Sequence, residues 1–203
     1  MGRGPADARL VRGDVVSAGV RTFDPVFDSQ RVFRCVLQAT AQPGKLFALP
    51  PTGVAPREAV ARTLLDHEVT LCALGDRAEE AERISGLTGS RIVPVNEADF
   101  VLVSTGSGAG VSSLKRGTLE RPETGATAIF AVRRLSNTGT LTLKLSGPGI
   151  RGGRSLGAEG LSAEVAEAIR ESRQGYPLGV DVYLVDEAGQ VAGLPRSTSL
   201  EVA

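Results

Sequence analysis

Hydrophobic residues in the first half of the chain alternate between helical spacing and short continuous runs. Helical spacing occurs in 28–42, 56–65 and 77–87, and strand-like apolar runs separate these segments. Helices that alternate with strands indicate a layered α/β arrangement. In the second half, turns join apolar segments into hairpins, which favours a mixed sheet over a purely parallel one. The sequence therefore predicts an α/β fold in which helices flank a mixed β-sheet.

The predicted helices have recognisable ends. Asp28 is expected to cap the first helix, and the Pro43-Gly44 pair is expected to stop it. Gly89 should end the helix over 77–87. A fourth helix is expected from Leu161 to Ser172, with Ser162 placed to cap it.

Apolar runs between turn signals predict the strands. Two hairpins are expected: one pairs 126–132 with 141–145, and the other pairs 180–185 with 191–194. Asn137 and Gly139 would make the first turn. Further strands are expected at 45–49, 69–74, 91–95 and 100–104.

The chain of 203 residues is long enough for one hydrophobic core but short for two. Apolar residues are sparse in 1–19, so this segment is expected to be a flexible N-terminal tail. Residues 20–203 are expected to form a single domain.

Charge narrows the classes of partner. The 23 lysines and arginines balance 23 aspartates and glutamates, so no overall field attracts nucleic acid or an anionic membrane. No apolar run approaches the roughly 18 residues of a membrane span. A net charge near zero also favours self-association. Neither nucleic acid nor a membrane is expected as a partner.

The residues that usually carry catalysis are few. His67 is the single histidine, and a surface position in a turn is favoured over a role as catalytic base. Cys35 and Cys72 lie in apolar runs, which favours buried thiols over a disulfide and predicts a cytoplasmic protein. No spacing of these residues fits a metal site, and no lysine has a context that suits pyridoxal phosphate. We expect no catalytic residues, no metal and no cofactor.

Two segments could approach an anion. Gly147 and Gly149 allow close approach of the backbone, and Arg196, Ser197 and Thr198 offer a guanidinium and two hydroxyls. These five residues form a candidate phosphate or phosphonate site, although both segments could equally be structural turns. The glycine-rich loop 106–110 departs from known phosphate-binding patterns, and a flexible connection is favoured there.

Four blocks in order resemble the PhnH family, the H subunit of the bacterial carbon-phosphorus lyase core complex. The most specific block comprises YPLGVD at 176–181 and GLPRSTSLEV at 193–202. The others are Phe33-Arg34 with Pro43-Gly44, 117–127, and LSGPGI at 145–150. The longer N-terminal tail and the loop 106–110 depart from the family pattern.

This resemblance implies a subunit that joins the G, I and J subunits for phosphonate catabolism. The complex would form ribose 1-alkylphosphonate 5-triphosphate from ATP and an alkylphosphonate, acting as a ribose 1-methylphosphonate 5-triphosphate synthase. The resemblance also implies a homodimer with a fold similar to pyridoxal-phosphate-dependent transferases but without the cofactor site. Within such a transferase complex, this chain would be a structural partner that is not catalytic alone. The alternative is a free-standing transferase that binds nucleotide or phosphonate near Gly147 and Arg196.

Overall fold

The computed structural model describes residues 21–104, 108–139 and 141–203. The segment 1–19, expected to be a tail, lies outside these ranges, as do Gly106 and Ser107 of the glycine-rich loop. The described helices are α1 (Phe27–Ala41), α2 (Pro56–Leu64), α3 (Ala78–Thr88) and α4 (Ala163–Glu171), with the 3-10 helices η1 (Gly108–Ser113) and η2 (Pro122–Thr124). The strands are β1 (Phe47–Ala48), β2 (Thr70–Leu74), β3 (Arg91–Ile92), β4 (Phe100–Ser104), β5 (Thr127–Val132), β6 (Arg134–Ser136), β7 (Thr142–Ser146), β8 (Arg154–Glu159), β9 (Asp181–Asp186), β10 (Gln190–Leu194) and β11 (Ser199–Val202).

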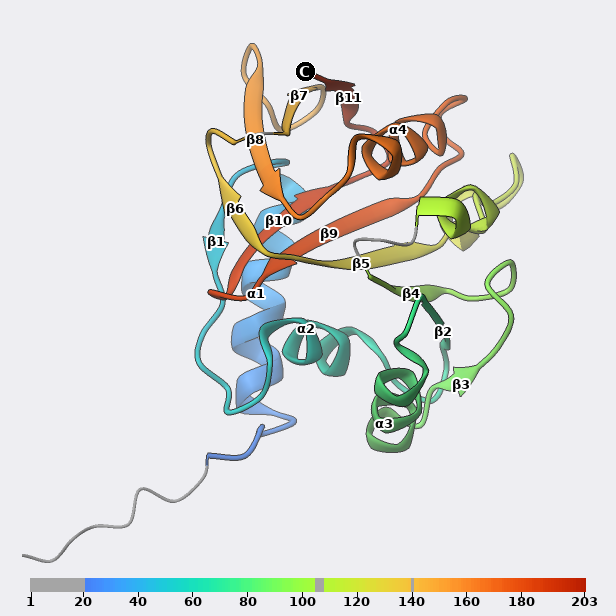
Figure 1. Cartoon of the computed structure of the whole chain (residues 1–203). Coiled ribbons are helices and arrows are strands. Elements are labelled where there is room, and N and C mark those ends of the chain that lie inside the picture. Colours follow the sequence, from blue (N-terminus) through green and yellow to red (C-terminus); the bar gives the residue numbers. More distant parts are fainter. Residues whose placement is uncertain (1–20, 105–107, 140) are drawn as a thin grey trace, which may run out of the picture.

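Seven strands form a mixed sheet, here called sheet A, in the order β1-β10-β9-β5-β4-β2-β3 (Figure 1). The neighbours from β9 to β3 pair in parallel, whereas β10 is antiparallel to both β9 and β1. The predicted mixed sheet is therefore confirmed. The predicted hairpin at the end of the chain is also confirmed, as β9 and β10.

The second sheet, sheet B, is antiparallel and has the order β11-β7-β8-β6. It was not expected from the sequence. The predicted hairpin of 126–132 with 141–145 is wrong, because β5 pairs in parallel with β4 and β9, whereas β7 pairs with β8 and β11. Burial explains the difference. Strand β5 is buried through Ala128, Ile129 and Phe130, as in a central strand covered on both faces, whereas buried and exposed residues alternate in β7.

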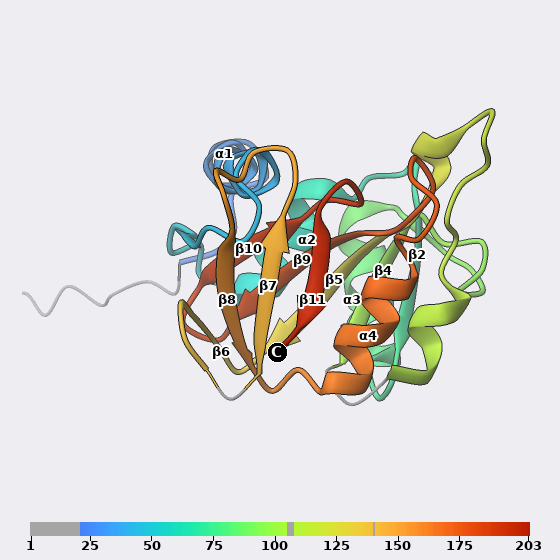
Figure 2. The same cartoon turned by 90° about the horizontal axis from the view of Figure 1, so that it is seen from above.

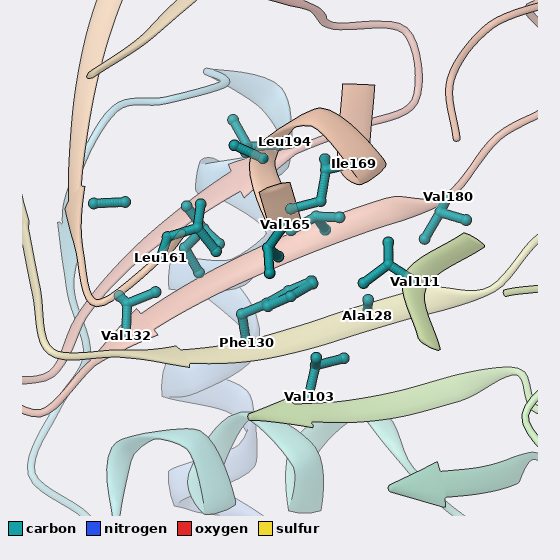
Figure 3. Packing of buried hydrophobic residues seen from close by; sticks show 14 of the residues in the cluster. Val103, Val111, Ala128, Phe130, Val132, Leu161, Val165, Ile169, Val180 and Leu194 are labelled. Atoms are coloured by element: carbon teal, nitrogen blue, oxygen red, sulfur yellow. The ribbon is translucent and has the colours of Figure 1, made fainter. Parts of the chain in front are cut away.

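Three layers result from this arrangement. Helices α1, α2 and α3 cover one face of sheet A, and sheet B lies beside α4 over the other face (Figures 1 and 2). Alternate residues of the central strands enter two cores: Leu102 and Ile129 face the three helices, whereas Val101, Val103 and Phe130 face α4 and sheet B. Figure 3 shows Phe130 beneath α4 with Val165 nearby.

The helix ends follow the sequence in three cases and differ in one. Helix α1 ends at Ala41, just before the Pro43-Gly44 pair. Gly89 ends α3 in the left-handed conformation, and the hydroxyl of Ser162 accepts a hydrogen bond from the backbone N–H of Val165 at the start of α4. Asp28 does not cap α1, which begins one residue earlier. The carboxylate of Asp24 instead accepts hydrogen bonds from the backbone N–H groups of Val26 and Phe27.

Candidate functional site

The arginine predicted to bind an anion lies just after β10, where the fold already engages its guanidinium. The backbone N–H of Arg196 donates to Asp181 at 2.7 Å and its Nε donates to the same carboxylate at 3.1 Å. Its Nη1 donates to the backbone carbonyl of Pro122. Arg196 therefore joins the end of β10, the start of β9 and η2.

Thr198, another residue of the predicted anion site, is buried beside Arg173. Arg173 is almost fully buried and donates to the carbonyl oxygens of Leu194, at 2.7 Å, and Thr198, at 3.3 Å. Burial lowers the pKa of Arg173 to about 10. Arg173 thus stabilises the segment between β10 and β11 through two hydrogen bonds from a buried position.

The two predicted glycines lie at different places. A Cβ on Gly147 would come within 2.9 Å of the carbonyl oxygen of Ser197, so the structure does bring Gly147 beside the 196–198 turn. Gly149 instead packs against the end of α1, where a Cβ would come within 2.5 Å of the carbonyl oxygen of Ala41. Gly147 thus lies beside the turn 196–198, whereas Gly149 lies apart from it, at the end of α1. Their role as an anion site stays a prediction.

The substitution Arg196→Lys tests the structural role of this arginine. Lysine keeps the charge but cannot reproduce a planar fork that reaches Asp181 and Pro122 together. We expect Arg196→Lys to lower the free energy of unfolding by about 1–3 kcal/mol, measured by urea denaturation. The matched change Arg121→Lys, at an exposed arginine that pairs with Glu123, should stay within about 0.5 kcal/mol. Equal stability of Arg196→Lys and the wild type would contradict the structural role.

A hollow of about 840 Å³ lies at the carboxyl edge of sheet A, where its parallel strands end. It is called here the carboxyl-edge hollow. It is bounded by the residues that follow β2, by the ends of β5 and β9, and by the first residues of α2 and α3. Ligands of open α/β sheets usually bind outside the carboxyl ends of the strands. The charged residues that line the hollow are Arg57, Asp76, Arg77, Glu79, Glu80, Arg83, Arg133, Asp186 and Glu187.

Arg57 is the most buried arginine of the hollow, with 7% of its surface exposed. Its Nε donates to Glu80 at 3.1 Å, and its Nη2 donates to the other oxygen of that carboxylate. Its Nη1 is buried and has no hydrogen-bond partner among the described residues. Burial lowers the pKa of Arg57, and the charge of Glu80 offsets part of this effect.

Arg77 links the hollow to the next strand of sheet A. Its Nε donates to the hydroxyl of Ser104, at the end of β4, at 2.8 Å. Its Nη1 lies 3.7 Å from Glu80, so this carboxylate lies between two arginines. Sequence reasoning did not single out either arginine. The available signal was that Arg57 and Arg77 each stand at the start of a predicted helix, where the preceding loop can reach the carboxyl edge.

Residues considered for other chemistry are dispersed. His67 is exposed beside Gly89. Cys35 and Cys72 are unpaired, as the sequence indicates, but both are only half-buried, so the expectation of buried thiols is met only in part. Burial raises the pKa of both thiols. Within the described ranges, no three His, Cys, Asp or Glu side chains gather in a way that could hold a metal ion.

A comparison with known protein families shows which family the chain belongs to. Residues 21–201 match the family described as bacterial phosphonate metabolism protein PhnH. The chain belongs to the PhnH family. The match runs from the residues before α1 into β11 and confirms the resemblance that the four sequence blocks indicate.

Two relatives extend the comparison. The chain is 33% identical over 175 residues to HtxG of Stutzerimonas stutzeri, which is named provisionally as a C-P lyase subunit protein; this covers 85% of the chain and 86% of the relative. It is 30% identical over 188 residues to the alpha-D-ribose 1-methylphosphonate 5-triphosphate synthase subunit PhnH of Rhizobium meliloti (strain 1021), covering 88% and 92%. The likeness to these two relatives therefore extends over most of the chain. None of the helices that the structure describes is both long and apolar enough to cross a membrane.

Proposed function

We propose that this protein is a subunit of the carbon-phosphorus lyase core complex of phosphonate catabolism. In this role it supports the formation of ribose 1-alkylphosphonate 5-triphosphate from ATP and an alkylphosphonate. The observation that carries the proposal is the family match over 21–201, together with two relatives named as subunits of a C-P lyase and of the corresponding synthase. The comparisons do not favour the alternative of a free-standing transferase.

The proposal assigns this subunit a structural role and gives it the G, I and J subunits as partners. Exposed apolar side chains along one side of α1 support a protein that functions in contact with others: Val26 is 69% exposed, Phe33 48% and Leu37 55%. Val26 directly precedes α1, and Phe33 and Leu37 are one turn apart on it, so the three lie along one side of the helix. Exposed apolar side chains that gather on one side of an element often mark a protein-protein interface.

Three finer statements belong to the same proposal. Residues 20–203 form one domain, which is supported by a core shared between sheet A, sheet B and α4. The protein is a cytoplasmic homodimer, in keeping with a net charge of zero and two unpaired cysteines. Its fold is similar to that of pyridoxal-phosphate-dependent transferases without the cofactor site, for which the mixed α/β sheet is the supporting observation.

Co-expression tests this assignment. The chain is produced with the G, I and J subunits, and the mixture is analysed by size-exclusion chromatography with mass determination, with each subunit omitted in turn. We expect one complex that contains this chain and that loses synthase activity when this chain is omitted. A chain that always elutes separately, beside a complete and active complex of the other three, would overturn the proposal.

A further inference from the structure

We propose that the carboxyl-edge hollow binds a small anion that carries a phosphate or phosphonate group. The geometry alone points to an oxyanion. The choice of phosphate and phosphonate among oxyanions rests on the proposed function in phosphonate metabolism. The hollow is separate from the five residues that the sequence predicts as an anion site, because none of these five lines it.

The first observation is the unused hydrogen-bonding capacity of Arg57. Two of its nitrogens hold Glu80, and Nη1 is left buried without a partner among the described residues. A buried N–H group that lacks a partner is costly, and native proteins rarely retain one unless a ligand or water completes it. Arg57 lines the hollow, so an oxyanion bound there is a candidate partner for its guanidinium.

The second observation is that two helices begin at the same hollow. The start of α2, with Ala55 and Arg57, and the start of α3, with Arg77 and Glu79, both line it. Neither helix has a side chain that caps its first turn. The first backbone N–H groups of a helix have no partner within the helix, and the helix dipole adds positive potential there. Two uncapped helix starts and two arginines therefore surround one space, an arrangement suited to an anion.

The acidic residues of the hollow are either engaged by other groups or exposed to solvent. Glu80 is neutralised by Arg57 and Arg77, and the two oxygens of Asp186 accept hydrogen bonds from the backbone N–H groups of Leu135 and Gln190. Asp76, Glu79 and Glu187 are exposed to solvent, where water screens their charges.

The remaining arginines of the hollow differ in how freely they can move. Arg133 pairs with Glu159 at 2.7 Å, and both side chains are exposed. Such a pair contributes little to stability, so Arg133 can turn toward a ligand at small cost. Arg83 pairs at 2.5 Å with Glu58, which is buried, so this arginine keeps its position. A volume of about 840 Å³ is within the usual range for small-molecule sites and exceeds the needs of a single phosphate group.

Binding is tested on the full chain by calorimetry and by NMR of the arginine Nε–H groups and the backbone amides of Glu58 and Glu79. Methylphosphonate, tripolyphosphate and ATP are titrated separately, and adenosine serves as the ligand without phosphate. We expect at least one of the three anions to shift the resonances of Arg57 and Arg77, and adenosine to leave them unchanged. Among the anions, the strongest binder identifies the source of the oxyanion group.

Variants then locate the site. Arg77→Gln removes a half-buried guanidinium and should weaken the strongest anion about ten- to a hundredfold, the usual effect of losing one charge-assisted hydrogen bond. Arg57→Lys, which retains the charge, should weaken it similarly. The control is Arg121→Gln, which removes an exposed arginine near the opposite end of β5 and should leave affinity unchanged.

The inference is overturned if none of the three anions produces heat or resonance shifts at millimolar concentration. It is also overturned if binding persists unchanged in both hollow variants, because the ligand would then lie elsewhere. Assembly with the G, I and J subunits is read separately by chromatography. A chain that binds an anion but does not assemble refutes only the proposed function, and one that assembles without binding refutes only this inference.

Discussion

Replacing Phe130 by alanine is expected to lower the free energy of unfolding by about 3–5 kcal/mol, the range for deleting a buried aromatic side chain. Phe130 is fully buried in β5, the middle strand of sheet A, and packs in the core that includes α4 and sheet B (Figure 3). Its neighbours come from three separate parts of the fold, so they cannot collapse together to fill the space. Urea denaturation with a single slope should measure the loss.

Phe33→Ala is the matched control, because it removes the same side chain from α1, where 48% of the residue is exposed. We expect a change of about 0.5 kcal/mol or less in the isolated protein. Similar losses in the two variants would mean that Phe33 is covered in solution or that Phe130 does not support the core. Either result would contradict the burial described above.

Gly193→Ala is expected to lower the free energy of unfolding by about 2–3 kcal/mol, in the upper part of the range for overpacking. Strand β10 crosses α1 at this glycine, and a Cβ would lie 2.6 Å from the carbonyl oxygen of Ala39 and 2.9 Å from the backbone nitrogen of Thr40. These atoms belong to a helix backbone and cannot rotate away. Relief requires α1 to move as a unit, which would strain the 2.7 Å hydrogen bond between Thr40 and Tyr183.

The same substitution in α3 should have the opposite sign. A Cβ on Gly86 would meet no atom within 4 Å, and the residue lies inside a helix, where alanine is favoured over glycine by roughly 0.5–1 kcal/mol. We therefore expect Gly86→Ala to raise the midpoint of thermal unfolding, whereas Gly193→Ala lowers it. A stabilising Gly193→Ala would show that α1 and β10 are farther apart than the structure has them.

The helices and most strands of sheet A could be predicted as separate elements because their signals are local. The spacing of Val32 and Val36 reports the buried side of α1 directly, and Ser162 marks the start of α4 by its own side chain. The error at the start of α1 has a specific cause. The position of Asp28 before the apolar spacing suggests a cap, and only the fold shows that Asp28 is buried and bonded to Arg21 and to the backbone N–H of Asp24.

Sheet B could not be predicted because two of its three strand pairings join strands that are not consecutive in the chain. Strand β11 pairs with β7, and β6 pairs with β8, across long connections. The sequence around Asn137 and Gly139 has a typical turn composition, and a hairpin of its two flanking strands was the simplest local interpretation. The three-residue β6 follows β5 almost immediately and carries the chain into the other sheet instead.

The candidate sites also depend on contacts between distant segments, which the sequence alone does not reveal. The sequence could indicate that Gly147 and Arg196 stand in segments that allow close approach, and the fold does place Gly147 beside the turn that follows Arg196. It could not indicate that Asp181 engages Arg196, because that pairing arises only when β9 and β10 are adjacent. Likewise, Arg57 and Arg77 come together only once α2 and α3 lie on the same face of sheet A.

The two edges of sheet A are the strands β1 and β3, each two residues long. Long uncovered edge strands recruit foreign strands through their free backbone groups, which leads to polymerisation or to capture of extended peptides. These two-residue strands themselves leave few backbone groups available for such growth. Recognition at these two strands therefore depends mainly on the shape and chemistry of side chains, which makes it sensitive to single surface substitutions and resistant to indiscriminate strand addition.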